Sequence, residues 1–276
     1  RESRCHSTML MAKSCHDLDL MVWMKSGTSP SRVASYGSNF QFRRDKAPAD
    51  AGTRCLVDCP IEPECLYSAR KHYIDHPERW SFYVWELLED VEEPTIEDKM
   101  ESLRTDNPFG RCVWKCDNDV VDHQSVVVDF EDGCTGTLNM IGGASKPQRS
   151  IHIIGTRGEI EGEFESSRFV IRHIDPRPGH EYSEKTVDLN ESGDMTGAFG
   201  GHGGGDMRLV HDFVQVLNGE EPSISWTGLD DSVRGHLLGF CADRAREEGL
   251  GIEVGAKLRN ETDVVDQNRP GFSGVE

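Results

Sequence analysis

The 276-residue sequence has few positive charges and no long hydrophobic run, and both absences exclude classes of protein. Its longest mainly apolar segments, Leu18–Met24 and Val126–Phe130, are far shorter than the roughly 20 residues that a membrane-spanning helix needs. Against 30 Lys and Arg stand 49 Asp and Glu, which gives a net charge of −19. Because nucleic-acid binding requires a positive surface that displaces counterions from phosphates, this charge argues against a phosphate-backbone binder.

Lysine is especially scarce, with 9 Lys against 21 Arg, and the acids are spread along the whole chain. Such a surface favours a salt-adapted source, since salt at 1 M shortens electrostatic repulsion to about 3 Å. The alternative is an ordinary acidic protein of the cytosol.

No basic region followed by an apolar segment opens the chain, so we expect no secretory signal and a cytoplasmic location. The chain begins with Arg1 rather than Met, which indicates a processed product or a fragment.

The pattern of apolar residues predicts helices at both ends of the chain and strands between them. Met11, Cys15, Leu18 and Val22 form one stripe of a helix over 9–25. Further helices are expected at 64–73, 96–104 (behind a Thr95/Asp98 capping box), 207–217 and 230–248. Strands are expected at 32–40, 125–130, 134–141, 151–154, 159–164, 169–174 and 186–189.

Successive strands with tight turns predict an antiparallel sheet, and strands framed by helices predict an α+β fold. We therefore expect an open-faced, mainly antiparallel sheet with helices packed on one face. One domain is expected over 1–254, followed by a polar tail over 255–276. The sequence lacks a Rossmann fingerprint, because the glycine-rich segment 197–205 follows a polar stretch rather than a strand.

The first predicted helix carries the best candidate for acid–base chemistry. At 100° per residue, Ala12, His16, Asp19 and Trp23 lie within an arc of roughly 60°, and Lys13 is next to it. Histidine ordinarily titrates near neutrality, and a carboxylate three residues away can orient its ring. We predict His16, Lys13 and Asp19 as catalytic residues and Trp23 as a substrate contact. The alternative is a solvated His–Asp pair on a helix surface.

Two other segments have polar residues that could serve a site. His202 lies in the glycine-rich segment, from which it could reach a pocket, and we predict it as a substrate-binding residue. Asp206, four residues later, is predicted to cap the following helix. Asp122 and His123 stand just before a predicted strand, where turn formation and strand entry are the favoured roles.

The nine cysteines include a dense group, since Cys55, Cys59 and Cys65 lie within eleven residues and Cys112 and Cys116 are spaced similarly. Four thiolates can hold zinc or an iron–sulfur cluster. This hypothesis gives Cys55, Cys59 and Cys65 as metal ligands, with Cys112 or Cys116 as the fourth. The other interpretation is that they are reduced, partly buried cysteines of a cytosolic protein.

Several segments together resemble the C-terminal half of the Gfo/Idh/MocA family of oxidoreductases. They are MLMAKSCHDLDLM at 9–21, CVWKCDNDVVDHQ at 112–124, the hairpin around 130–133, IIGTRGEIEG at 153–162 and HGGGD at 202–206. The resemblance covers about 9–254 and rests on the order and spacing of the segments. It implies an open sheet that packs against its twin in a dimer, and a substrate pocket facing a preceding Rossmann domain.

The resemblance also implies a function, with one departure from the family's pattern. It implies an NAD(P)-dependent oxidoreductase of a sugar, inositol or related polyol. NAD or NADP would be bound by an N-terminal domain that is absent from this sequence. The family's Glu-Lys-Pro motif is also absent from this sequence. The chain alone is therefore expected to be inactive. In the family pattern D-x-x-x-H-x-x-D, the histidine corresponds to His16 and the second acid to Asp19. Ala12 stands at the position of the first acid. The alternatives are a noncatalytic oligomerising or carbohydrate-binding module and a small structural zinc protein.

Overall fold

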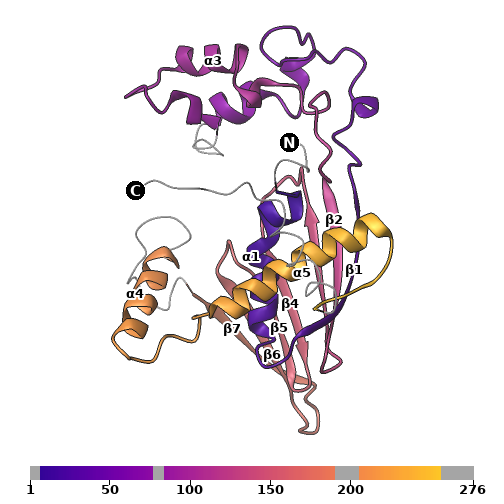
Figure 1. Ribbon diagram of the computed structural model, residues 1–276, viewed down its shortest axis with the longest axis vertical. Coiled ribbons are helices and arrows are strands. Elements are labelled where there is room, and N and C mark those ends of the chain that lie inside the picture. The colour runs from indigo at the N-terminus through magenta and orange to yellow at the C-terminus, as the bar shows by residue number, and fades with distance from the viewer. Residues whose placement is uncertain (1–6, 77–83, 190–204, 256–276) are drawn as a thin grey trace, which may run out of the picture. The chain divides into compact units, whose positions relative to one another are not determined.

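The computed structural model describes residues 7–76, 84–189 and 205–255, which fall into two compact units (Figure 1). Unit 1 contains the described residues up to Gly142 and those from Leu229 onward. Unit 2 contains those between Gly143 and Gly228. No helix in these residues is long and apolar enough to cross a membrane.

Unit 1 is built on an antiparallel four-stranded sheet in the order β3-β2-β1-β8. Its strands are β1 (Pro30–Ser38), β2 (His123–Phe130), β3 (Thr135–Ile141) and β8 (Ile252–Glu253), and its two long helices are α1 (Met9–Met24) and α5 (Leu229–Glu248). Alternate residues of β2, from Gln124 to Phe130, are buried. With Leu18 of α1 and Leu238 of α5, the apolar ones form the main core.

The segment between β1 and β2 contains α3 (Ile96–Arg104) and several single turns. These turns are 3₁₀ helices at Arg44–Lys46, Glu62–Glu64, Glu86–Leu88 and Pro108–Gly110, and a π-helical turn at Lys71–Asp75. The Thr95/Asp98 capping box of α3 is confirmed. The helix predicted at 64–73 begins later than expected, because residues 65–68 form a turn and the helical residues are 69–75.

Unit 2 contains a second antiparallel sheet, in the order β4-β5-β6-β7, and helix α4 (Gly205–Leu217). Its strands are β4 (Ser150–Gly155), β5 (Gly158–Glu163), β6 (Arg168–Ile174) and β7 (Tyr182–Asp188). The register gives this sheet two chemically different faces. One face is apolar, with Ile151, Ile153, Ile160, Phe169, Ile171 and Val187. The other is charged, with His152, Glu159, Glu161, Arg172 and Glu184.

The predicted fold class is confirmed: the chain is mixed α and β, with open antiparallel sheets and helices packed on a sheet. The strands form two four-stranded sheets, one in each unit. Helix α5 has its glycines on the covered side. Phe240 and Val233 are exposed, whereas Gly235 and Gly239 are buried. The domain bounds 1–254 and 255–276 stay a prediction.

Candidate active site on helix α1

Helix α1 carries the predicted catalytic residues on a firmly held scaffold. Thr8 caps its first turn, where its hydroxyl accepts a hydrogen bond from the backbone N–H of Met11 at 3.3 Å. The same hydroxyl donates to the Asp243 carboxylate on α5 at 2.6 Å. Leu18 and Val22 are buried against the core. These contacts fix the rotation of α1 about its axis and therefore decide which residues reach solvent.

The structure places the predicted residues at different depths on α1. His16 and Lys13 are exposed, as is Ala12, at the position where the family pattern has its first acid. Trp23 is half-buried, two turns further along the helix from His16. Asp19 is also half-buried, on the side that meets α5. His16 and Lys13 can therefore contact a ligand directly, whereas Asp19 lies on the side of the helix that faces α5 and is less accessible to a ligand.

Asp19 lies in a mixed electrostatic environment. Burial raises the pKa of its carboxyl above the ordinary range, and the positive charges of His236 and His16 oppose that rise. Asp231 has the same sign as Asp19 and adds to the rise. His16 is thus one of the charged groups that act on Asp19, and the catalytic roles of both residues stay a prediction.

Sequence reasoning missed the part of this group that comes from α5. Asp231, Gly235 and His236 lie 212 to 217 positions after Asp19, so no local pattern on α1 could indicate them. The signal available in the sequence was the pair Gly235 and Gly239, four residues apart in a predicted helix. Small residues at this spacing allow a second helix to approach closely, as α1 and α5 do where they cross in Figure 1.

The other polar candidates have different outcomes. His202 lies outside the described residues, so its substrate-binding role stays a prediction. Asp206 is the second residue of α4 rather than its N-cap, because the helix already begins at Gly205.

Asp122 has the structural role that the sequence favoured. Its carboxylate accepts hydrogen bonds from the backbone N–H groups of Phe40 (3.0 Å), Gln41 (2.5 Å) and Phe42 (3.1 Å). The Nδ1 atom of His123 lies 3.0 Å from it. Burial alone would raise the pKa of Asp122, but the bonds from His123 and the three amides together lower it to about 2. Asp122 therefore ties the end of β1 to the start of β2.

The cysteines do not form the predicted metal site. In the described parts of the chain, no group of three or more His, Cys, Asp or Glu side chains is placed to hold a metal ion. Three of the five thiols belong to two apolar clusters. Cys65 packs with Cys112 and Trp114, and Cys55 packs with Leu103. Burial raises the pKa of the Cys55 thiol to about 11, which favours the neutral thiol over a metal-binding thiolate.

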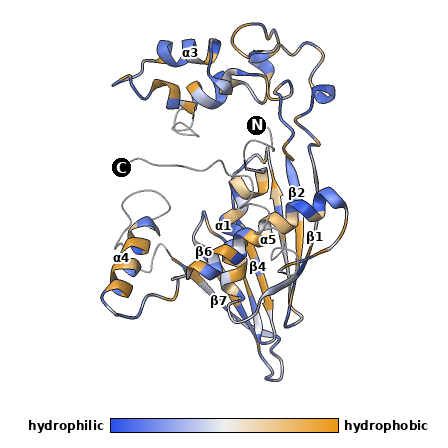
Figure 2. Cartoon of the chain, in the orientation of Figure 1, coloured by the Kyte–Doolittle hydropathy of each residue, from blue (hydrophilic) through white to orange (hydrophobic). Residues whose placement is uncertain are grey.

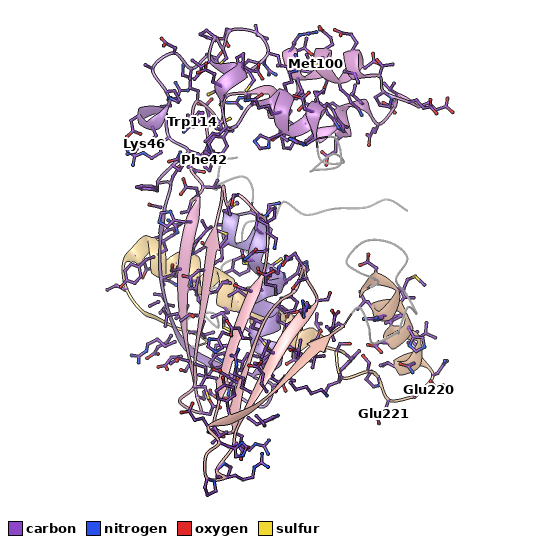
Figure 3. All side chains as sticks on the ribbon, turned by 180° about the vertical axis from the view of Figure 1, so that it is seen from behind. Phe42, Lys46, Met100, Trp114, Glu220 and Glu221 are labelled. Atoms are coloured by element: carbon purple, nitrogen blue, oxygen red, sulfur yellow. The ribbon has the colours of Figure 1, made fainter. Side chains whose placement is uncertain are left out.

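Aromatic side chains fill the space around these cysteines. Phe42 and Trp114, both labelled in Figure 3, each meet Tyr67 edge-on, with ring centroids 5.3 and 5.2 Å away. The eight described cysteines are all free of disulfides. Aromatic and apolar packing therefore contributes to holding this part of unit 1 together.

Nucleotide binding does not fit the described residues of the chain. A Rossmann site needs a glycine-rich turn that leads from a strand directly into a helix. Among the described glycines, Gly133 closes the β2–β3 hairpin and Gly158 packs against the backbone of Arg172.

Residues 2–235 match the family model described as "Oxidoreductase family, C-terminal alpha/beta domain" of the Gfo/Idh/MocA type. The protein named "Putative oxidoreductase YteT" of Bacillus subtilis (strain 168) is 27% identical over 221 residues, which are 76% of this chain and 46% of that protein.

Two solved structures resemble the chain. A crystal structure of an oxidoreductase domain protein from Kribbella flavida has a TM-score of 0.52 at 13% identity, covering 89% of this chain and 51% of that one. A levoglucosan dehydrogenase, solved with NADH and levoglucosan, has a TM-score of 0.48 at 14% identity, covering 88% and 49%. The chain spans about half the length of the relatives that it matches.

Proposed function

Because this chain belongs to the Gfo/Idh/MocA oxidoreductase family, we propose that it forms the substrate-binding half of an NAD(P)-dependent oxidoreductase. The substrate is a sugar, inositol or related polyol, whose carbinol carbon exchanges hydride with nicotinamide. Since the described residues offer no dinucleotide site, NAD or NADP is bound by a domain outside them. The observation that carries the proposal is the exposed His16 on α1, with Asp19 half-buried beside it.

The residues of α1 supply proton handling and charge. Oxidation of a secondary alcohol requires its hydroxyl proton to leave, and an exposed imidazole such as His16 can accept that proton at a ring nitrogen. The negative charge of Asp19 favours the imidazolium that results. Lys13, exposed one step round the helix, provides a positive charge for oxygen as it becomes negative. Trp23 is the predicted substrate contact on the same helix.

The second candidate is a noncatalytic carbohydrate-binding or oligomerising module. The observation in its favour is Ala12, which occupies the position of the family's first acid and leaves no carboxylate there. Both candidates predict a polyol near α1, so binding alone does not separate them. Hydride transfer to or from nicotinamide distinguishes the two candidates, because only the oxidoreductase carries it out.

The test is to join the chain to the nucleotide-binding half of a family member and follow NAD(P)H formation with a panel of sugars and polyols. We expect the joined protein to turn over at least one substrate of the panel. His16→Ala should lower that turnover at least 100-fold, which is the usual contribution of a general base, and should leave the affinity for the cofactor unchanged. His180→Ala, an exposed histidine of unit 2, is the matched control. Binding without turnover would favour the module, and equal activity of His16→Ala would refute the role of His16.

The apolar face of the unit 2 sheet supports the proposal that the protein forms a homo-oligomer. None of the described residues in β4 to β7 is buried, and Ile153 is 37% exposed. We propose that a second copy of the chain covers this face, as the resemblance implied. If so, the Ile171→Lys variant should be a monomer when its mass is measured by light scattering. The Val170→Lys variant, which changes the charged face, should keep the mass of the oligomer. An unchanged mass for Ile171→Lys would contradict it.

A further inference from the structure

We propose that the open face of the unit 1 sheet binds an oligosaccharide, with sugar rings placed along Tyr36, His123 and Phe40. Sugar rings stack their C–H groups on aromatic faces, and their hydroxyl groups need hydrogen-bonding partners beside those aromatic side chains. Both features are present on this face. The inference goes beyond the proposed function, because α1 packs on the opposite face of the sheet (Figure 1).

The strand register places the three side chains on one face. Ser35 of β1 is buried, so Tyr36 and Ser38 face the other way. Ser38 is paired with His123 of β2, and Phe40 follows two residues after Ser38. Tyr36 is 73% exposed and Phe40 is 61% exposed. Extended backbone places the Cα atoms of these two residues up to about 13 Å apart, which is longer than one sugar ring.

The His123 ring is held in place by its neighbour in the chain. The carboxylate of Asp122 accepts hydrogen bonds from the backbone N–H groups of Phe40 and Phe42, and its Oδ1 lies 3.0 Å from Nδ1 of His123. Because this carboxylate is an acceptor, Nδ1 carries the hydrogen. The other ring nitrogen, Nε2, can then accept a hydrogen bond from a sugar hydroxyl.

Phe40 is fixed by two contacts of its own. Its ring meets the His123 ring edge-on, with ring centroids 6.2 Å apart. Lys46, labelled in Figure 3, lies over the Phe40 ring, with its Nζ 5.6 Å from the centroid. The side chain nevertheless stays well exposed, so a sugar ring can reach it. Since the aromatic side chains are already ordered, little conformational freedom is lost when a ligand binds.

Hydrogen-bonding groups lie beside Tyr36 on the same face. The register pairs Tyr36 with Ser125, and Ser125 with Asn139 of β3. The Ser125 hydroxyl donates to Oδ1 of Asn139 at 2.7 Å. The amide NH₂ group of Asn139 can therefore donate to a ligand, and the Ser125 oxygen can accept from one. Both residues are exposed, so donors and acceptors for sugar hydroxyls flank the aromatic side chains.

The part of the face around Tyr36 is nearly uncharged, although the chain has a net charge of −19. Arg32 lies at one end, in register with Asp129 and Glu253, and its Nη2 is 3.3 Å from Oδ2 of Asp129. From residue 34 onward along β1, and at the positions paired with it in β2 and β3, only His123 on this face can carry charge near neutral pH. In so acidic a protein, this region fits a neutral ligand better than a metal ion or a phosphate.

A second copy of the chain fits this face less well than a saccharide does. Three strands about 4.8 Å apart and about seven residues long present roughly 350 Å². A stable interface between proteins buries roughly 800 Å² on each partner and has an apolar core. This face is smaller than that, and Ser125 lies at its centre. Its size and polarity suit a ligand of a few sugar units.

The experiment is isothermal titration calorimetry of the chain with cellohexaose and with maltohexaose. We expect at least one of them to bind, and to bind more tightly than glucose, because a hexasaccharide reaches several of the aromatic side chains. Tyr36→Thr and Phe40→Ser should each lower the affinity about tenfold or more, as truncation of an aromatic anchor does, whereas Tyr36→Phe should change it less than about threefold. Tyr182→Thr, at an exposed tyrosine of β7 in unit 2, is the matched control.

The proposal fails if neither hexasaccharide binds, or if Tyr36→Thr and Phe40→Ser bind as tightly as the unmodified chain. Circular dichroism shows whether each variant is folded, and either variant alone is a sufficient test. A lower mass of Tyr36→Thr by light scattering would show that a second copy covers this face, and would also overturn the proposal. Hexasaccharide binding that His16→Ala abolishes and Tyr36→Thr leaves intact would place the ligand at α1 instead. Absence of polyol turnover with intact hexasaccharide binding would reject the proposed function alone.

Discussion

The two units bury their apolar residues to very different extents. In unit 1, α1 and α5 cover one face of the sheet, and Leu18, Val128 and Leu238 are completely buried. In unit 2, every described strand residue keeps some exposure, and the exposed apolar side chains of α4, including Leu209 and Phe213, continue this pattern (Figure 2). Unit 1 thus has its own core and carries the candidate site. Within the described residues, unit 2 is held by strand pairing and surface charges, and its apolar face is the one for which a partner surface is proposed.

The largest expected difference between the units is the cost of removing one apolar side chain. Leu18→Ala, in the core of unit 1, should lower the free energy of unfolding by about 2 to 5 kcal/mol, because it leaves a cavity. Ile154→Ala, at a residue 75% exposed in unit 2, should change it by less than about 0.5 kcal/mol. Urea unfolding measures both values. Equal losses would abolish the contrast between the units.

A second contrast concerns glycine. Gly235→Ala should cost roughly 1 to 3 kcal/mol from overpacking, reduced by up to about 1 kcal/mol through better helix propensity. In unit 2, a Cβ atom at Gly155 would meet only the carbonyl oxygen of Gly158, at an ordinary 3.6 Å. Gly155→Ala should therefore be nearly neutral in the same urea experiment. A stabilising Gly235→Ala would show that α1 and α5 are not tightly packed.

The third prediction is a pH effect confined to unit 1. The pKa of Asp122 is about 2 in the folded state, below its ordinary value of 3.8, so its ionised form stabilises the fold above about pH 4. That contribution is lost as the pH falls from about 4 to about 2. Asp122→Asn should cost about 1 to 2 kcal/mol at pH 7 and progressively less across this window. A difference that stays constant from pH 7 to pH 2 would contradict the assignment.

The smallest expected effect is electrostatic and belongs to unit 2. Arg172 pairs with Glu184 at 2.8 Å, Glu159 at 3.0 Å and Glu161 at 3.1 Å on the charged face. Arg172→Gln should lower the melting temperature slightly in dilute buffer, because three carboxylates then repel one another. Salt at 1 M should remove most of this loss. Thermal unfolding at the two salt concentrations measures it, and a loss independent of salt would point to packing instead.

Much of the fold could be predicted because it is encoded locally. The stripe on α1, the Thr95/Asp98 capping box and the Asp132-Gly133 turn each depend on a few neighbouring residues, and the structure confirms all three. The contact face of α5 is not encoded in this local way, because large apolar residues such as Phe240 are exposed. The helix instead packs through Gly235 and Gly239, which have no side chains to indicate a face.

The candidate site was predictable only in part, for the same reason. His16 and Asp19 share one helix, so their proximity follows from helical geometry. Gly235 lies against Asp19 only because a second helix crosses the first, and that crossing is decided by long-range packing. The metal prediction for the cysteines failed because density along the chain does not determine where the thiols point. Burial placed Cys55 and Cys65 in different apolar clusters.

The most direct test of the central claim is to map where a polyol binds. Histidine ring resonances, followed by NMR during titration with a sugar and polyol panel, report on both units at once. We predict that a bound polyol shifts the resonances of His16 in unit 1 in a saturable way and leaves those of His180 in unit 2 unchanged. A saturable shift at His180 with none at His16 would contradict the claim that α1 carries the site.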